Sequence, residues 1–294
     1  MTTPLPTWSG RPTTLAGALT VRRVLPAARQ RAVGPFVVFD HFGPVTLGAE
    51  VDSDVGTHPH IGLATVTYLF EGSFLHRDSL GTVQTITPGA INWMTAGSGI
   101  AHSERVPDDQ RGRPRRLHGL QLWVALPPAL ETVAPSFQHV AADAILSVAL
   151  EGGASVRVLV GSAWGQTSPV RTASPTLYLD VQLPPHATWA LPPLAPEMAL
   201  YSPEAELHID GEVLAAQQMA LLPSDAGVVV QAGSDGARFV VIGGAPLEQP
   251  VRMWWNFVAT DRERIAAAAQ RWEAGDFPVI PGETQRIAAP PWTG

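Results

Sequence analysis

The sequence contains no cysteine and no lysine, and only 15% of its 294 residues are charged. Without cysteine it has no disulfide, no thiolate metal ligand and no cysteine nucleophile. The net charge of −7 leaves no dominant cationic face for nucleic-acid phosphates, so direct nucleic-acid binding is not expected. The sequence has no run of about 18 apolar residues that would suggest a membrane span, and its N-terminus lacks a signal-peptide pattern. We therefore expect a cytoplasmic protein.

Hydrophobic residues, by contrast, make up 45% of the chain, and 27 glycines and 28 prolines are spread through it without a collagen-like period. This composition favours buried cores built from many short strands joined by turns. A strand at 36–39 is expected to end in a turn at 40–44, because Gly43 and Pro44 are typical turn residues. Further strands are predicted at 19–25, 64–70, 74–78, 83–87, 91–95 and 117–126.

A second series of strand patterns follows a stretch at 127–150 that resembles a linker. These strands are predicted at 155–160, 176–183, 188–191, 198–202, 206–209, 219–222, 227–231 and 238–243, with a hairpin turn at Asp210-Gly211. The two series have similar size and rhythm, which suggests an internal duplication. We therefore predict domains at 1–135 and 151–294, with 136–150 between them.

The end of the chain has a helical pattern instead. Thr260 and Glu263 have the spacing of a capping box, and apolar residues then recur with helical periodicity up to Trp272. Gly275 follows as a helix stop. The sequence predicts a helix at about 261–274, anchored by the aromatic residues at 254–257.

Two pairs of metal-capable side chains stand out in the first series: His58 with His60, and His102 with Glu104. Residues i and i+2 of a strand point to the same face, about 6.5 Å apart along the strand. If the two strands face or pair with each other, three imidazoles and a carboxylate converge on one point. Such a donor set suits Fe(II), Mn(II), Co(II), Ni(II), Cu(II) or Zn(II), and the residues alone do not select one ion.

The other histidines have weaker patterns. His118 shares strand parity with apolar residues and is interpreted as a core residue. His76 either lines the pocket or pairs with Asp78, and His41 is either a neighbour of the ligands or a turn residue. His186 and His208 stand without a partner at i±2, so no metal is expected in the second half. A G-x-S-x-G hydrolase motif and the glycine patterns of nucleotide-binding loops are absent.

Several stretches resemble the pirin family, which belongs to the bicupins of the cupin superfamily. They are 33–44, THPHIGLATVTYLFEG, HRDSLG, TPGAINWMTAGSGIAHSE, LHGLQLWVALP and the tail WWNFVATDRERIAAAAQRWEAGDF. The resemblance covers almost the whole chain and is densest over 33–127. It implies an all-β fold of two cupin-type β-barrels (double-stranded β-helices) with a C-terminal helix. It also implies a mononuclear metal, usually Fe, in the first barrel, with His58, His60, His102 and Glu104 as ligands.

The sequence departs from the family pattern next to this site. Relatives commonly carry a Glu four positions after the second His of the HxH pair, where this chain has Ala64, and an Arg directly after that His, where it has Ile61. Ala64 shares parity with His60, so we expect it to face the site. The pocket should therefore be more apolar and less acidic than in relatives.

Two functions follow from the resemblance. The first is a dioxygenase similar to quercetin 2,3-dioxygenase, which opens a flavonol ring with O2; Glu104 would then be the base that takes the proton of the substrate hydroxyl. The second is a non-catalytic, metal-containing regulator that binds a transcription factor or a metabolic enzyme. In that case the basic segment 111–116 (RGRPRR) would be a docking patch, although a solvated loop is the simpler interpretation.

Overall fold

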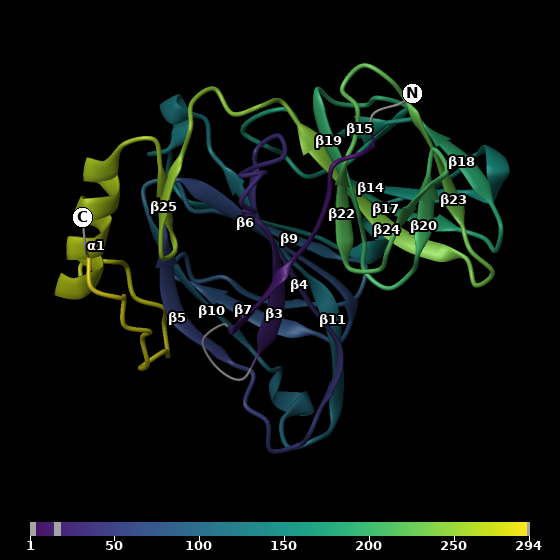
Figure 1. Cartoon of the computed structure of the whole chain (residues 1–294). Helices are drawn as coiled ribbons and strands as arrows, with labels where there is room; N and C mark the ends of the chain where they lie inside the picture. Colours follow the sequence, from purple (N-terminus) through teal and green to yellow (C-terminus); the bar gives the residue numbers. More distant parts are fainter. Residues whose placement is uncertain (1–3, 15–18, 293–294) are drawn as a thin grey trace. The chain divides into compact units, whose positions relative to one another are not determined.

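The structure, a computed structural model, describes residues 4–14 and 19–292. Within these ranges the chain is mostly β-strand, with one α-helix, α1 (Arg262–Ala274), near the end (Figure 1). The predicted class, all-β with a C-terminal helix, is therefore confirmed. Among the described residues no helix has the length and apolar character needed to cross a membrane.

The first strand series forms a large sheet and a small one. The large sheet has the order β12-β9-β6-β11-β4-β3-β2, and the small sheet has the order β5-β10-β7-β8. Their strands are β2 (Arg11–Thr14), β3 (Thr20–Leu25), β4 (Phe36–Leu47), β5 (Val55–His60), β6 (Leu63–Glu71), β7 (Phe74–Asp78), β8 (Val83–Ile86), β9 (Ile91–Thr95), β10 (Ile100–Arg105), β11 (Arg115–Ala125) and β12 (Ser136–Val140).

The second series repeats this pattern, with seven strands in the order β1-β22-β19-β24-β17-β14-β13 and four in the order β18-β23-β20-β21. Their strands are β1 (Thr7–Ser9), β13 (Ser147–Ala149), β14 (Ser155–Val160), β17 (Thr176–Leu183), β18 (Thr188–Leu191), β19 (Glu197–Ser202), β20 (Leu207–Ile209), β21 (Glu212–Leu214), β22 (Gln218–Leu221), β23 (Val228–Ala232) and β24 (Ala237–Gly244). The described residues also form two small hairpins: β15 (Ser162–Ala163) with β16 (Gln166–Thr167), and β25 (Arg252–Trp254) with β26 (Phe257–Ala259). The 3-10 turns are η1 (Asp108–Gln110), η2 (Pro128–Leu130), η3 (Ala142–Ala144) and η4 (Glu151–Gly153).

The chain divides into two compact units. The histidine unit comprises Pro12–Arg22, Asp40–Ala142 and the segment from Leu247 onward, and it holds seven of the nine histidines. The apolar unit comprises the residues up to Arg11, Arg23–Phe39 and Asp143–Pro246.

This division differs from the one predicted at 136–150. The junction at 142–143 lies inside that stretch, but the segment from Leu247 belongs with the first strand series. The reason is packing: Phe257 and the helix residues Ile265 and Trp272 share one apolar cluster with Ile61 and Ala101. The expected linker is also structured, because β12 pairs with β9 and β13 pairs with β14.

The predicted turn at 40–44 is wrong, since β4 continues through it to Leu47. Gly43 has a φ of +75°, and a Cβ there would lie 2.1 Å from the carbonyl oxygen of Leu117 on β11. Glycine is thus required here for close approach of two backbones, not for a chain reversal.

Helix α1 begins and ends close to the predicted positions, but its cap differs by one residue. Asp261, not Thr260, is the N-cap, and its side chain accepts a hydrogen bond from the backbone N–H of Glu263 at 2.8 Å. Gly275 ends the helix in the left-handed conformation, with φ of 81°. Its buried face consists of Ile265, Ala268, Ala269 and Trp272, as the apolar period predicted.

Candidate metal centre

Three histidines from two neighbouring strands meet in the histidine unit. Strands β5 and β10 pair antiparallel, with His102 opposite His58 and Ile100 opposite His60. One ligand atom of each of His58, His60 and His102 lies within 4.8 Å of the other two, and all three residues are buried. The predicted convergence is therefore present for the three imidazoles. It results from the two-residue period of β5 and from the pairing register of β5 with β10.

Backbone carbonyls fix the orientation of two of these rings. The Nδ1 of His58 lies 2.8 Å from the carbonyl oxygen of Gly56, and that of His60 lies 3.0 Å from the carbonyl oxygen of Asn256. A carbonyl only accepts hydrogen bonds, so each Nδ1 carries the proton and each Nε2 has a free lone pair. This is the tautomer that binds a metal through Nε2.

The Nε2 atoms of two of the three rings approach each other. Those of His60 and His102 are 3.1 Å apart, and the Nδ1 of His102 is buried without a hydrogen-bond partner among the described residues. Burial lowers the pKa of His58 to about 4 and lowers those of His60 and His102 well below the usual value, so the rings are neutral at pH 7. Neutral imidazoles with converging lone pairs are the donor set that a divalent transition ion requires.

Glu104 lies beside this cluster but is not part of it. The pairing of β10 with β5 shifts between His102 and Glu104, so the carboxylate is offset from the imidazoles. Its Oε1 accepts a hydrogen bond from the Thr67 hydroxyl at 3.2 Å. Burial raises the pKa of Glu104, opposed by nearby His76 and by this hydrogen bond. Its role as a fourth ligand stays a prediction.

His76 lies opposite Glu104 on the other side of β10. Of the two alternatives for this residue, the pairing with Asp78 is present: His76 Nε2 and Asp78 Oδ2 are 3.0 Å apart. Its ring centroid is also 5.3 Å from that of His102. Burial alone would raise the pKa of Asp78, but hydrogen bonds from His76 and Thr82 outweigh it and leave the pKa below its usual value. Asp78 is thus an ionised acceptor that orients His76 beside the cluster.

His41 and His118 form a separate buried pair, with their Nε2 atoms 2.9 Å apart. His118 is a core residue, as predicted, and its ring also packs on Phe70. His41 lies in strand β4 and not in a turn. Its contact with the ligands, the other alternative, stays a prediction.

Ala64 is fully buried, but the reasoning from shared parity with His60 does not hold. Strand β5 ends at His60 and β6 begins at Leu63, with the chain turning at Gly62, where φ is +67°. The two residues lie on different strands, so their alternation is not continuous. Ala64 pairs with Val124 and Thr95 in the large sheet.

The sequence interpretation missed the part played by the C-terminal segment. The carbonyl of Asn256, which orients His60, lies in the turn of the β25–β26 hairpin, where Trp255 adopts a φ of 50°. Trp123 places its ring edge-on to His60, and Phe137 stacks on His76 with a centroid distance of 4.5 Å. A backbone carbonyl leaves no signal in side-chain patterns, although the aromatic run at 254–257 marks the segment.

Three of the four arginines of the 111–116 segment, Arg111, Arg115 and Arg116, have acidic, carbonyl or hydroxyl partners. Arg111 contacts Asp54 and Asp108, Arg115 donates to the carbonyl of Val51 and the hydroxyl of Ser53, and Arg116 contacts Glu71 at 2.7 Å. Strand β11 begins at Arg115, so the segment is only partly a loop. These contacts favour the solvated interpretation of the segment.

Comparison with known proteins shows the family of the chain. A family model described as Pirin matches residues 18–124, and one described as Pirin C-terminal cupin domain matches 178–278. The chain belongs to the pirin family. A pirin-like protein of Caulobacter vibrioides is 42% identical over 261 residues, which cover 88% of this chain and 90% of the relative.

Solved structures identify the fold. A crystal structure of a quercetin 2,3-dioxygenase from Acinetobacter baumannii matches with a TM-score of 0.90 at 34% identity, covering 98% of this chain and 95% of that one. A bacterial pirin from Escherichia coli, solved in complex with nickel(II), matches with a TM-score of 0.65 at 18% identity over 83% of this chain and all of that one, and so supports the fold alone. The predicted bicupin architecture is confirmed.

Proposed function

We propose that this pirin is a metal-dependent oxygenase of the quercetin 2,3-dioxygenase type. His58, His60 and His102 would hold one divalent ion, and Glu104 would either complete the set or act as a base beside it. The main support is the orientation of the His58 and His60 rings, whose Nδ1 atoms face backbone carbonyls so that Nε2 is left free. Ring orientations fixed in this way would preorganise an ion-binding site.

The bound ion would supply Lewis acidity to a hydroxyl-bearing substrate. Glu104 is suited to take the hydroxyl proton, because burial raises its pKa and so makes the carboxylate a stronger base. The Thr67 hydroxyl holds one oxygen of Glu104, which leaves the other for the proton. His76, held by Asp78 across from Glu104, is placed to limit how far that carboxylate moves.

Two comparisons support the metal and the substrate class. Iron is the expected ion from the family resemblance, and the nickel complex of the distant E. coli pirin indicates that the fold accepts other divalent ions. The quercetin 2,3-dioxygenase from A. baumannii, similar over nearly the whole chain, favours a flat aromatic substrate with O2 as co-substrate. Trp123 and Phe137 border the histidines and would suit such a ring.

An anaerobic Fe(II) reconstitution followed by an aerobic assay tests the proposal. Metal content of the purified chain would be measured first, and loss of the flavonol absorbance of quercetin would be followed on the same sample. We expect one ion per chain and O2-dependent turnover. Glu104→Gln should retain the ion and lose most of the turnover if Glu104 is the base, and it should lose the ion as well if Glu104 is a ligand.

A matched control comes from a histidine outside the cluster. His208→Ala, in strand β20 of the apolar unit, should keep both ion and turnover, whereas His60→Ala should lose both. A fully metal-loaded protein that leaves quercetin and related flavonols unchanged in air would refute the oxygenase proposal while leaving the metal site intact.

The regulator hypothesis stays a prediction with weaker support. The contacts of Arg111, Arg115 and Arg116 with acidic and carbonyl groups reduce the charge available for a partner. An affinity capture with wild type and with Arg115→Glu/Arg116→Glu tests it directly. Identical captured proteins would remove this segment as a docking site.

A further inference from the structure

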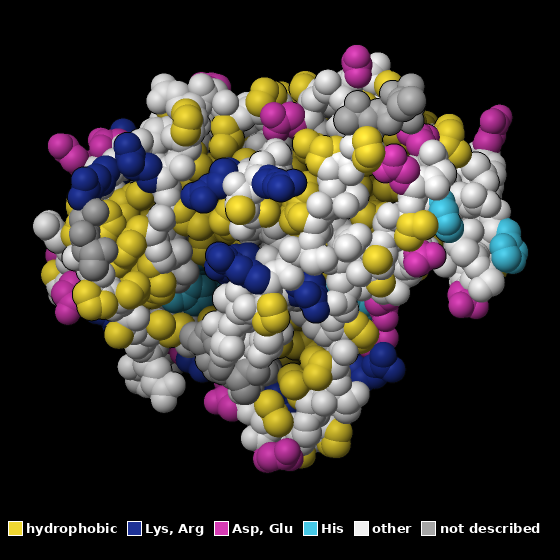
Figure 2. All heavy atoms as spheres, viewed as in Figure 1, with side chains coloured by type: hydrophobic (Ala, Val, Ile, Leu, Met, Phe, Trp, Pro, Cys, Tyr) yellow, Lys and Arg dark blue, Asp and Glu magenta, His cyan; other side chains and the backbone are white. Residues whose placement is uncertain are grey.

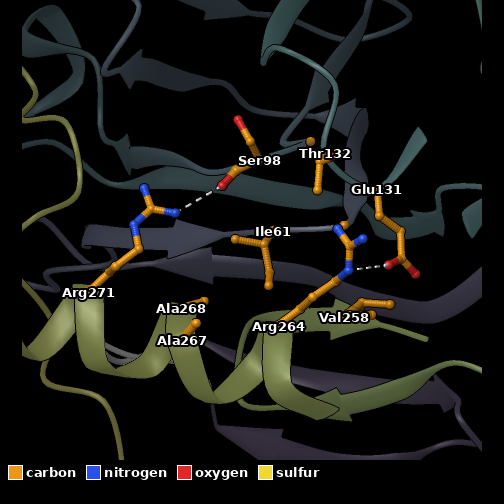
Figure 3. A pocket seen from close by; sticks show the side chains of 12 residues that line it. Ile61, Ser98, Glu131, Thr132, Val258, Arg264, Ala267, Ala268 and Arg271 are labelled. Carbon is orange, nitrogen blue, oxygen red and sulfur yellow. Dashed lines mark hydrogen bonds and ion pairs between the residues drawn. The ribbon is translucent and has the colours of Figure 1, made fainter. Parts of the chain in front are cut away.

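A cavity outside the histidine cluster lies in the histidine unit, between helix α1 and the loops that follow β5 and β9. It has a volume of about 240 Å³. Its apolar surface comes from small or short side chains, with Ile61 at the centre and Ala267 and Ala268 on the helix (Figure 3). Gly62 and Gly97 also line it, and the N–H of Gly62 donates to the carbonyl of Gly97 at 2.9 Å.

A buried carboxylate with one oxygen that accepts no hydrogen bond occupies one end. The Glu131 side chain is only 2% exposed. Its Oε1 accepts a hydrogen bond from the N–H of Thr260 at 2.6 Å, whereas its Oε2 has no hydrogen-bond partner among the described residues. The Nε of Arg264 forms an ion pair with this Oε2 at 3.7 Å, which is beyond hydrogen-bond distance (Figure 3). A buried acceptor without a donor is costly, so this end of the cavity is suited to a ligand N–H or O–H group.

A guanidinium group occupies the other end (Figure 3). Arg271 donates from Nη1 to the carbonyl oxygen of Ser98 at 3.2 Å, and its Cζ lies 4.6 Å from the Phe277 ring centroid. These contacts hold the group in place and use one of its five N–H donors. Positions 264 and 271 are two helical turns apart, which is about 10 Å at 1.5 Å per residue.

We propose that this cavity binds a small amphoteric molecule, with an amine at Glu131, a carboxylate at Arg271 and an apolar body across Ile61. The amine supplies the donor that Glu131 Oε2 lacks, and the carboxylate pairs with the remaining N–H groups of Arg271. Neither Glu131 nor Arg271 belongs to the His58–His60–His102 cluster, so the site does not depend on the oxygenase proposal.

Calorimetric titration of the full-length protein with three probes of equal chain length tests the charge pattern. The probes are 6-aminohexanoate, hexanoate and 1-aminohexane. We expect 6-aminohexanoate to bind at one site per chain, and each singly charged probe to bind at least about tenfold more weakly, because it leaves one end of the cavity unpaired. Absence of saturable binding by 6-aminohexanoate, or equal affinity for all three probes, would overturn the proposal.

Variants locate the binding. Ala267→Leu fills the cavity from an exposed helix position and should abolish binding, whereas the matched Ala274→Leu, on the same helix but outside the cavity, should not change it. Glu131→Gln keeps an acceptor for Thr260 but replaces the unused acceptor with a donor. This variant should lower the affinity for 6-aminohexanoate by about tenfold, to about the affinity for hexanoate. Binding that survives Ala267→Leu would place the ligand elsewhere and overturn the assignment.

The metal-free wild-type protein, prepared with a chelator, separates this site from the metal centre. It should bind 6-aminohexanoate with unchanged affinity. Loss of binding on removal of the ion, with recovery when the ion is restored, would mean that the carboxylate coordinates the ion, and the proposed cavity site would be wrong.

Discussion

The two units carry chemically different side chains at the same sheet positions. In the histidine unit the four-stranded sheet has the order β5-β10-β7-β8, and in the apolar unit it has the order β18-β23-β20-β21. The registers correspond as well: His102 pairs with His58 across β10 and β5, and Val230 pairs with Trp189 across β23 and β18. The duplication that the sequence suggested, without a residue alignment, thus becomes visible in strand pairing.

This correspondence extends across the sheet. By position in the register, residues of the histidine unit and their counterparts in the apolar unit are His58 and Trp189, His60 and Leu191, His102 and Val230, Asp78 and Ile209, and His76 and Leu207. Every counterpart in the apolar unit is buried and belongs to a single hydrophobic cluster of that unit. The histidines that do occur in that unit are His186, which is exposed, and His208, which is half-buried; Figure 2 shows histidine side chains at the surface where β18 and β23 lie.

The comparison teaches that burial at these positions is set by the fold, whereas the chemistry is set by side-chain choice. Apolar side chains there stabilise the unit by roughly 25 cal/mol for each Å² removed from water. Imidazoles at the same positions give up that stabilisation and must be desolvated. The histidine unit carries this cost in its metal-free form, and a bound ion would offset it.

The largest effect is expected from giving the histidine unit the side chains of its counterpart. His60→Leu/His102→Val should lower the affinity for Fe(II) or Ni(II) by at least about 100-fold, since two of three nitrogen donors are lost. The metal-free protein should be as stable as wild type or more so, because buried polar groups are replaced by apolar ones. Metal analysis and calorimetric unfolding measure both. Full retention of the ion would refute the site.

The reverse exchange should cost stability. Val230→His places an imidazole in the apolar cluster with no polar partner, and we expect a loss of about 3 kcal/mol in the free energy of unfolding. Urea unfolding followed by tryptophan fluorescence measures it. A loss below about 1 kcal/mol would show that the apolar unit admits a polar side chain at this position and would weaken the comparison.

A smaller effect should follow from disturbing the backbone that orients His60. A Cβ at Gly62 would lie 1.9 Å from the carbonyl oxygen of Val258, and φ there is +67°. Gly62→Ala should therefore displace the β25–β26 hairpin, destabilise the protein by about 2 kcal/mol and weaken metal binding by about tenfold. Gly211→Ala also has a positive φ but open space, so it serves as the control for backbone strain. Equal metal affinity in both variants would contradict a role for the hairpin.

Lower pH should reduce the stability of the metal-free histidine unit through His41. Burial, with help from His118 and Arg22, lowers the pKa of His41 to about 3. The contribution of neutral His41 to the free energy of unfolding is fully present above the unfolded-state pKa of about 6.5. It is lost as the pH falls from there towards 3, because only the unfolded chain takes up the proton in this range. At pH 5 this amounts to about 2 kcal/mol. His41→Gln should make the unfolding free energy less dependent on pH between 7 and 5 in urea titrations; an unchanged slope would contradict it.

Much of the fold could be predicted because alternation is a local property. The strands at 74–78, 91–95, 155–160, 176–183 and 188–191 have the predicted limits, and Asp210-Gly211 turns between β20 and β21. Each of these segments has apolar residues alternating with polar ones, or a turn pair at its end. The helix limits could be predicted for the same reason, since Trp272 and Gly275 mark its buried face and its stop.

The misplaced elements depend on contacts between distant segments. Gly43 reads as a turn residue, but its role depends on how closely β11 approaches. Glu131 lay in an expected linker, yet it lies in a cavity with residues of β26 and α1, and its hydrogen-bond donor Thr260 follows 129 positions later. The contact of the Asn256 carbonyl with His60 could not be predicted for the same reason. Any residue at position 256 would supply the same backbone oxygen.

The sequence by itself determined the all-β fold with its terminal helix and the candidate donors, because strand and helix periods and side-chain chemistry are carried by neighbouring residues. Only the tertiary structure decided that three imidazoles meet, that the pairing of β10 with β5 shifts between His102 and Glu104, and that the segment from Leu247 belongs to the histidine unit. Pairing register and backbone contacts between distant segments are set by the packing of the whole unit, and a local pattern does not contain them.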